Sequence, residues 1–204
     1  MLRRYTASAD TTIVSAYELN MSTRGTGSNA GQADILETFS IYGRQSTSSQ
    51  ELSRILVKFP TDQISSDRSA GKIPASGSVS FYLRMFNAPH SKTVPKNYKL
   101  IVKPISSSWE EGEGLDLEGY KDVTYDEVGA NWIRSGGSTS WTKVGGDYLG
   151  TPIYSQSFDP GPENLEIDIS ELVENWITGA PSKFENYGVG IFMSSSYEAS
   201  ASQS

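Results

Sequence analysis

Apolar and polar residues alternate over several stretches of the chain, which is the period-two pattern of strands that bury one face. In one clear stretch, Phe81, Leu83 and Met85 would face one way while their polar and aromatic neighbours face the other. Proline ends two of the stretches, because it cannot donate a hydrogen bond to a strand ladder. The pattern predicts strands at residues 51–60, 78–86, 97–104, 164–169 and 187–193, and a weaker strand at 33–39 with Ile35 inward.

A helical pattern follows the 164–169 stretch. Asp168 is placed to cap a helix N-terminus, with Glu171 three residues later as its reciprocal partner. Gly179 supplies a typical stop signal. The residues that would share the apolar face of this short helix are Leu172, Val173 and Trp176.

Many short strands with one helix indicate an all-β fold, which we interpret as a jelly-roll-type antiparallel β-sandwich with one short helix near the C-terminus. The connections are polar and no composition shift marks a linker, so residues 1–193 are expected to form a single domain. Residues 194–204 are interpreted as a Ser-rich C-terminal tail. No strand pattern follows Met193, so the sandwich would lack its closing strand and leave a sheet edge open to another chain.

Composition narrows the function classes. The chain has a net charge of −7 and no basic block, which argues against nucleic acid as a direct partner. No run of about 18 apolar residues is present, so no membrane span is predicted. The absence of cysteine excludes disulfides and thiolate metal sites. The hydrophobic fraction of 36% suits a sandwich whose sheets each keep one wet face.

Catalytic signatures are sparse. The single histidine, His90, lies in a turn-like loop, and no nucleophile-elbow motif accompanies it. The segment 109–116 gathers four acidic residues beside a tryptophan, and paired carboxylates are the groups that glycoside hydrolysis requires. A Gly-rich acidic loop is more typical of a solvated turn or a cation site, so we predict that the protein is not an enzyme.

Two kinds of binding site remain as hypotheses. Ca²⁺ takes carboxylate, amide and backbone oxygens from irregular loops, although the spacing here does not fit an EF-hand. The candidate ligands are Asp10, Asn29, Glu111 and Asp116, with Glu113 and Asp168 as further acids. Trp109 and Trp141 lie in polar loops and are candidates for stacking on a sugar ring, with packing in the core as the alternative.

Several short segments resemble the DNRLRE-type family of carbohydrate-binding-module-like domains. The family's Ala-Asp-Thr opening, its Asn-x-Gly turn and its Ser-Arg-x-Leu strand are matched at residues 9–13, 29–36 and 53–59, and residues 108–112 and 186–191 also match. This resemblance implies a jelly-roll fold and extends over most of the chain. It also implies an alternative function, namely a carbohydrate-binding module that recognises a surface polysaccharide.

A narrower similarity is to virion structural proteins of marine tailed phages. It is carried by residues 109–116, 131–133, 140–148 and 158–169. The similarity implies a non-enzymatic decoration, neck or tail component, located in the virion after assembly in the host cytoplasm. Its partners would be other virion proteins in a homo- or hetero-oligomer. Such proteins continue past the Asn-Tyr-Gly strand with one more strand, which is the strand that this chain lacks.

Overall fold

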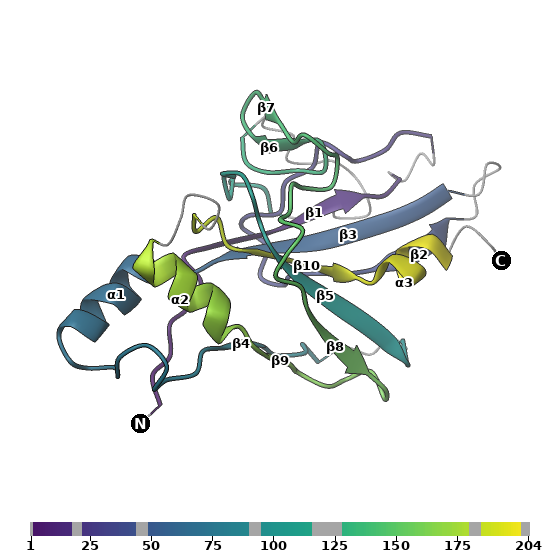
Figure 1. The fold of residues 1–204 in the computed structure, drawn as a ribbon. Coiled ribbons are helices and arrows are strands. Elements are labelled where there is room, and N and C mark those ends of the chain that lie inside the picture. The colour runs from purple at the N-terminus through teal and green to yellow at the C-terminus, as the bar shows by residue number, and fades with distance from the viewer. Residues whose placement is uncertain are drawn as a thin grey trace.

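The fold is given by a computed structural model, which describes residues 2–17, 22–43, 49–89, 95–115, 128–179 and 185–200. Antiparallel strands dominate these residues, with a few short helices, so the predicted all-β sandwich is confirmed (Figure 1). Within this described part of the chain, none of the helices is long and apolar enough to cross a membrane.

The central sheet contains six strands, all paired antiparallel. They are β1 (Ala9–Ser15), β2 (Ser40–Gly43), β3 (Ser49–Lys58), β5 (Tyr98–Pro104), β8 (Tyr154–Phe158) and β10 (Val189–Met193). Their order is β1-β3-β10-β5-β8, with β2 also paired to β3. The last strand, β10, therefore lies in the middle of the sheet, where Val189 is opposite Val57 on one side and Pro104 on the other.

A second layer covers one face of this sheet. It consists of the strand pair β4 (Tyr82–Met85) and β9 (Leu165–Asp168), with the helices α1 (Thr61–Ser69) and α2 (Ser170–Thr178) at one end (Figure 1). The main hydrophobic core lies between the layers, where Val57, Val102 and Ile191 of the sheet pack with Leu83 and Leu172. Burial of these aliphatic side chains is the chief force that holds the two layers together.

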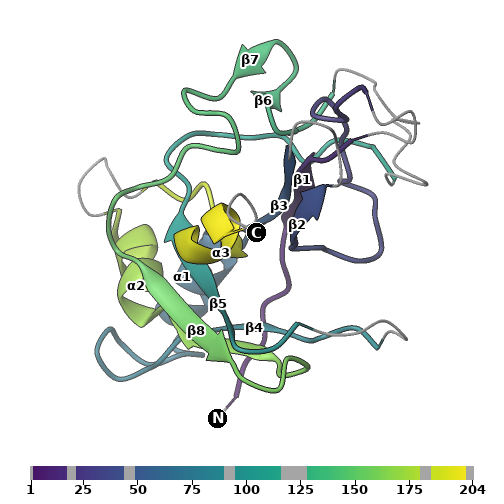
Figure 2. The same ribbon diagram turned by 90° about the vertical axis from the view of Figure 1, so that its right-hand side faces the viewer.

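Long loops cover the opposite face of the sheet. They carry the hairpin β6 (Arg134–Gly136) and β7 (Thr139–Ser140), which Figure 2 shows on the far side of the sheet from β4. A second hydrophobic cluster lies under these loops and includes Ile13, Leu56, Ile105, Trp132 and Trp141. Much of the central sheet, namely β1, β10 and residues 55–57 of β3, is therefore buried on both faces, whereas the composition suggested one wet face for each sheet. The strands β5 and β8 still alternate between buried and more exposed positions.

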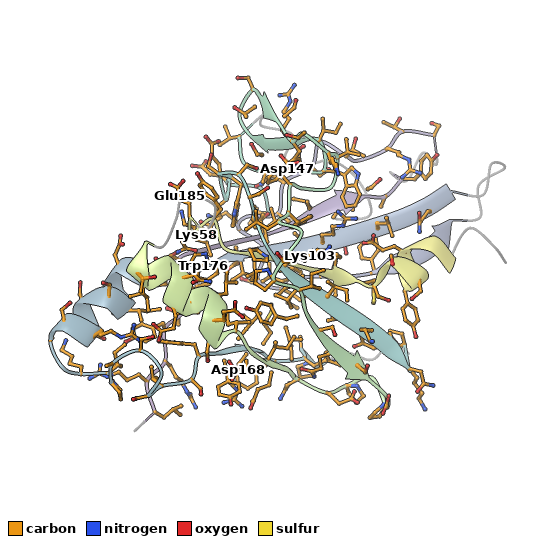
Figure 3. The ribbon with its side chains drawn as sticks, viewed as in Figure 1. Lys58, Lys103, Asp147, Asp168, Trp176 and Glu185 are labelled. Atoms are coloured by element: carbon orange, nitrogen blue, oxygen red, sulfur yellow. The ribbon has the colours of Figure 1, made fainter. Side chains whose placement is uncertain are left out.

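The predicted helix is present as α2. Its three expected apolar residues are all buried, and Gly179 adopts the left-handed conformation that ends it, with φ of 60°. The N-cap residue is Ile169, so Asp168 lies one residue before the predicted capping position. Its carboxylate still accepts the backbone N–H of Ser170, the first residue of the helix, at 2.8 Å. Trp176 extends from α2 toward the central sheet (Figure 3) and is 8% exposed.

The weak strand expected at residues 33–39 is wrong. This segment is irregular and Ile35 is 56% exposed, while the strand β2 begins only at Ser40. Side chains replace the strand ladder here, because the Thr12 hydroxyl accepts the N–H of Glu37 and the Ser53 hydroxyl accepts the N–H of Phe39. These hydroxyl groups belong to β1 and β3, so side chains of the sheet hold the backbone of this segment where a paired strand was expected.

Seven elements of the described residues did not stand out in the sequence pattern: β1, β2, β6, β7, β8, α1 and α3 (Ser195–Ser200). The helix α3 lies in the Ser-rich segment after Met193, where neither helix nor strand was expected. An ion pair between Arg54 of β3 and Glu198 fixes it to the sheet, with an N–O distance of 2.9 Å.

Candidate interaction surface

Three of the four candidate Ca²⁺ ligands lie together, because Glu111 contacts both Asp10 and Asn29. The Glu111 carboxylate accepts the backbone N–H of Asp10 at 2.8 Å. Burial, and then the negative charge of Glu111, raise the pKa of the Asp10 carboxyl. Asp116 lies outside the described residues, as does His90. Across the described ranges, no three His, Cys, Asp or Glu side chains are grouped so that they could hold a metal ion.

Asn29 has a structural role that occupies its whole amide. Its Nδ2 donates to the carbonyls of Glu111 and Ala130, each at 2.8 Å, and its Oδ1 accepts the N–H groups of Gly31 and Gly114. An amide has two donor hydrogens and two acceptor lone pairs, so no lone pair remains for a cation. The side chain is 2% exposed. Asn29 is therefore a clamp between loops, and its side chain is not placed to bind Ca²⁺.

Glycine makes room for this clamp. A Cβ atom at Gly112 would lie 2.3 Å from the Asn29 Oδ1 atom, and one at Gly129 would lie 2.5 Å from Nδ2. Both glycines also have positive φ, at 83° and 87°, which side-chain-bearing residues rarely adopt. Glycine at these positions therefore allows the backbone to pack closely around the Asn29 amide.

Of the two candidate sugar-binding tryptophans, Trp141 is a core residue and Trp109 packs against the core. Trp141 is 5% exposed, and its indole N–H donates to the Asn131 carbonyl at 2.8 Å. Trp109 is partly buried against the second cluster, and its indole N–H donates to the Tyr187 carbonyl at 2.7 Å. Trp141 therefore presents no ring face to solvent, and the polar sequence around it covers a hydrophobic cluster.

A large hollow lies along β4 instead. It has a volume of about 880 Å³ and lies between the N-terminal segment 2–7 and β4. Figures 1 and 2 show this N-terminal segment passing close to β4 on its way to β1. The apolar lining includes Leu36, Val57 and Phe59 on one side and Phe81, Leu83, Met85 and Trp176 on the other. We call this hollow the β4 groove.

One edge of β4 is unpaired beside this groove. The Ile169 N–H donates to the Phe81 carbonyl, and antiparallel bonding alternates, so Leu83 and Met85 direct their backbone groups to β9. Tyr82 and Arg84 direct theirs away from β9, where they meet no hydrogen-bond partner among the described residues. Tyr82 is 54% exposed and Phe86, just after the strand, is 71% exposed.

The other edges near the second layer are closed by side chains. Beyond β9, the Gln156 amide accepts the N–H of Glu166 and donates to the Asn164 carbonyl, both at 2.8 Å. This amide continues the ladder toward β8 as a third strand would. At β1, the Glu111 carboxylate covers the N–H of Asp10. Natural sheets usually protect their edges in such ways, so the bare edge of β4 stands out.

The groove is lined by more positive than negative side chains. The cations are Arg3, Arg4, Lys72 and Arg84, and the acids are Asp10 and Glu166. Asp67 pairs with Lys72 at 2.8 Å and with Arg3 at 3.3 Å. The hydrogen bonds from Lys72 and then Tyr5 lower the pKa of the Asp67 carboxyl. Arg84 pairs through Nε with Glu166 across the strand pair, at 2.7 Å.

The sequence contained part of this surface. Alternation across 78–86 predicted both the strand and its inward face, which Leu83 and Met85 confirm. Sequence could not show which strand would be left without a neighbour, because strand order depends on contacts between distant segments. Comparison of the chain with protein-family models, with curated protein sequences and with solved structures finds no match.

Proposed function

We propose that the protein is a non-enzymatic structural component of a tailed-phage virion, acting through protein–protein assembly. The observation that carries the assembly function is the unpaired edge of β4 beside an apolar groove of about 880 Å³. The phage setting is supported by the similarity of residues 109–116, 131–133, 140–148 and 158–169 to virion proteins.

An unpaired strand edge and an apolar hollow favour protein partners over small ligands. Backbone N–H and C=O groups along an edge bind another strand, and pockets beside them take alternate side chains. Contiguous apolar surface of this kind marks protein–protein contact on soluble proteins. The groove presents both features on the same side of the second layer.

The carbohydrate-binding alternative has less support from the side chains. Sugar platforms need an exposed aromatic ring beside polar groups, whereas Trp141 is 5% exposed and the indole N–H groups of Trp109 and Trp141 both bind backbone carbonyls. We therefore place the interaction surface at β4.

The proposed function is tested on particles whose genome encodes the chain. Purification through a density gradient followed by quantitative mass spectrometry should recover the protein at a fixed copy number per particle. Its absence from intact particles would overturn the proposal. Light scattering of the isolated protein then separates self-assembly, which gives a defined oligomer, from assembly with other virion proteins, which leaves a monomer.

A further inference from the structure

The free edge of β4 has the geometry of a strand acceptor. Tyr82 and Arg84 point their backbone groups outward, so an extended segment has two residues at which it can exchange N–H···O=C bonds with β4. Such a segment would turn the two-stranded layer into a three-stranded sheet. A two-stranded sheet is marginal alone, and a third strand with an apolar face adds stability.

The lining of the β4 groove determines which side chains the added segment can direct inward. Leu83 is 2% exposed and points into the core, while the neighbouring groove is lined by Val57, Phe59 and Ile64. Side chains alternate along a strand, so every second residue of an added segment would face these apolar groups. Those residues must be apolar to fill the groove.

The remaining side chains of the segment would lie on the outer face beside Arg84. The chain already shows which chemistry suits this face, because β9 places Glu166 opposite Arg84 and Asp168 opposite Tyr82. The closest contact of Arg84 with Glu166 is through Nε, and its guanidinium lies over the Phe86 ring. A guanidinium has five N–H donors, so Arg84 has the donors to meet a second carboxylate as well. Arg4, exposed at the groove rim, adds positive charge on a chain whose net charge is −7.

We propose that the β4 groove binds an extended segment of a partner protein in which apolar residues alternate with acidic ones, added as a third strand beside β4. The proposal rests on the assembly function and specifies the chemistry of the partner. A second copy of this chain is disfavoured as the occupant, because two chains of charge −7 repel each other at long range.

The probe is an acetylated, amidated peptide with the sequence of residues 163–169, which has the apolar–acidic alternation of β9. Binding to the full chain is measured by calorimetry, and amide exchange is followed by NMR. The peptide should slow exchange of the Tyr82 and Arg84 amides at least about tenfold. Exposure of the Leu83 and Met85 amides instead would mean that the peptide displaces β9, and would overturn the proposal.

Altered peptides test the two kinds of contact without touching the protein. Lysine in place of both acids that match Glu166 and Asp168 should weaken binding at least about tenfold. Two further peptides carry N-methyl groups, one on the odd-numbered amides and the other on the even-numbered amides. Only every second amide of an added strand points toward β4, so one of these peptides should lose binding and the other should keep it. Equal binding by all of these peptides would show that no strand is formed.

Variants of the protein complete the test. Arg84→Glu should weaken peptide binding at least about tenfold, whereas Lys99→Glu, the same charge change at an exposed position of β5, should not. Arg84→Pro removes an outward N–H without removing a bond to β9, and should abolish the protection of β4. Unchanged affinity in both Arg84 variants would contradict the strand site.

The outcomes separate this site from the proposed function. A protein that occurs in particles but does not bind the peptide keeps the assembly function and loses the strand site. A protein that binds the peptide but is absent from particles does the reverse. If the free protein is a dimer that the peptide dissociates, a second copy fills the groove and the proposed partner is wrong.

Discussion

At the scale of single residues, Asn29 joins three segments that are distant in sequence. Its amide bonds to Gly31 in its own loop, to Glu111 and Gly114 in the acidic loop, and to Ala130 beyond it. The bonds to Ala130 and Gly114 are buried, and a lost partner in such a place costs more than the bond itself contributes. This one side chain therefore orders the acidic loop against the start of the chain.

We predict that Asn29→Asp destabilises the protein by at least about 3 kcal/mol. The carboxylate cannot donate, so two buried carbonyls lose their partners at about 1–3 kcal/mol each, and a charge is buried in addition. Urea unfolding followed by circular dichroism measures the loss. Gln63→Glu makes the same amide-to-acid change at an exposed position of α1 and should leave the unfolding free energy nearly unchanged.

Asp10 gives a prediction for pH. Its pKa is raised above the ordinary 3.8 by burial and then by Glu111, so the folded state disfavours the ionised form. That penalty is complete above the raised pKa and disappears as pH falls below 3.8. Asp10→Asn should therefore stabilise the protein at pH 7, by less than about 1 kcal/mol because the group is partly exposed.

The pH profile provides the check. Thermal unfolding at a series of pH values should show the advantage of Asp10→Asn shrinking as the pH is lowered through the raised pKa. Asp34→Asn, at an exposed position, serves as the matched control. An advantage that grows toward low pH would contradict the predicted direction.

At the scale of elements, α3 is held on the sheet by Arg54 and by Tyr197, whose hydroxyl donates to the Asn97 carbonyl and whose carbonyl accepts the Ser40 hydroxyl. The Arg54 guanidinium binds Glu198 through Nε and Nη2 and donates through Nη1 to the Gly145 carbonyl. The rings of Trp132, Tyr148 and Phe192 surround it at 4.9 to 5.7 Å from their centroids. A six-residue helix has little stability of its own, so the Arg54 contact is a main part of what holds α3 on the sheet, together with the hydrogen bonds of Tyr197.

Glu198→Gln should release α3 while the core stays folded. Arg54 would keep its aromatic neighbours but lose a two-point charged partner, which costs about 1–3 kcal/mol. Hydrogen exchange should show α3 amides losing protection while those of β3 and β10 remain slow. The same change at exposed Glu171 of α2 is the control, and unchanged protection of α3 would count against the role of the pair.

The elements also show how far a residue pattern can reach. Alternation identified β3, β4, β5 and β9, an apolar run with glycine identified β10, and capping and spacing identified α2, because those signals are local. The pattern missed β1, whose residues read ADTTIVS, because both faces of this strand become covered and no simple alternation results. The helix α1 has almost no apolar face, with Ile64 its one buried aliphatic residue, so periodicity gave no signal.

At the scale of the whole molecule, the polar loops in which the sequence placed candidate binding residues do not present those residues to solvent. Trp141 lies in a run of serine, threonine and glycine, yet it is buried because that loop folds back over the central sheet. The edge of β4 was equally hidden from sequence, since it depends on which strand receives no neighbour. Both outcomes arise from long-range packing, which a local pattern does not encode.

Tryptophan fluorescence tests this arrangement for the whole chain. Three of the four tryptophans are 8% exposed or less, and the fourth, Trp109, is partly buried. We expect blue-shifted emission and weak quenching by acrylamide in the native protein, both changing on unfolding. Addition of oligosaccharides should leave the emission unchanged, and a saturable shift with any sugar would revive a glycan site.

The burial of much of the central sheet on both faces has a consequence for tolerance to mutation. In a one-sided sheet, every second position of a strand can drift freely, but in β3 Leu56 is as inaccessible as Ile55 and Val57. A scan of all single substitutions should therefore show a continuous intolerant stretch at residues 55–57 of β3, where the usual alternation is lost. Tolerated substitutions would instead be concentrated on the outer face of β4, where they would change which partner segment binds without disturbing the fold.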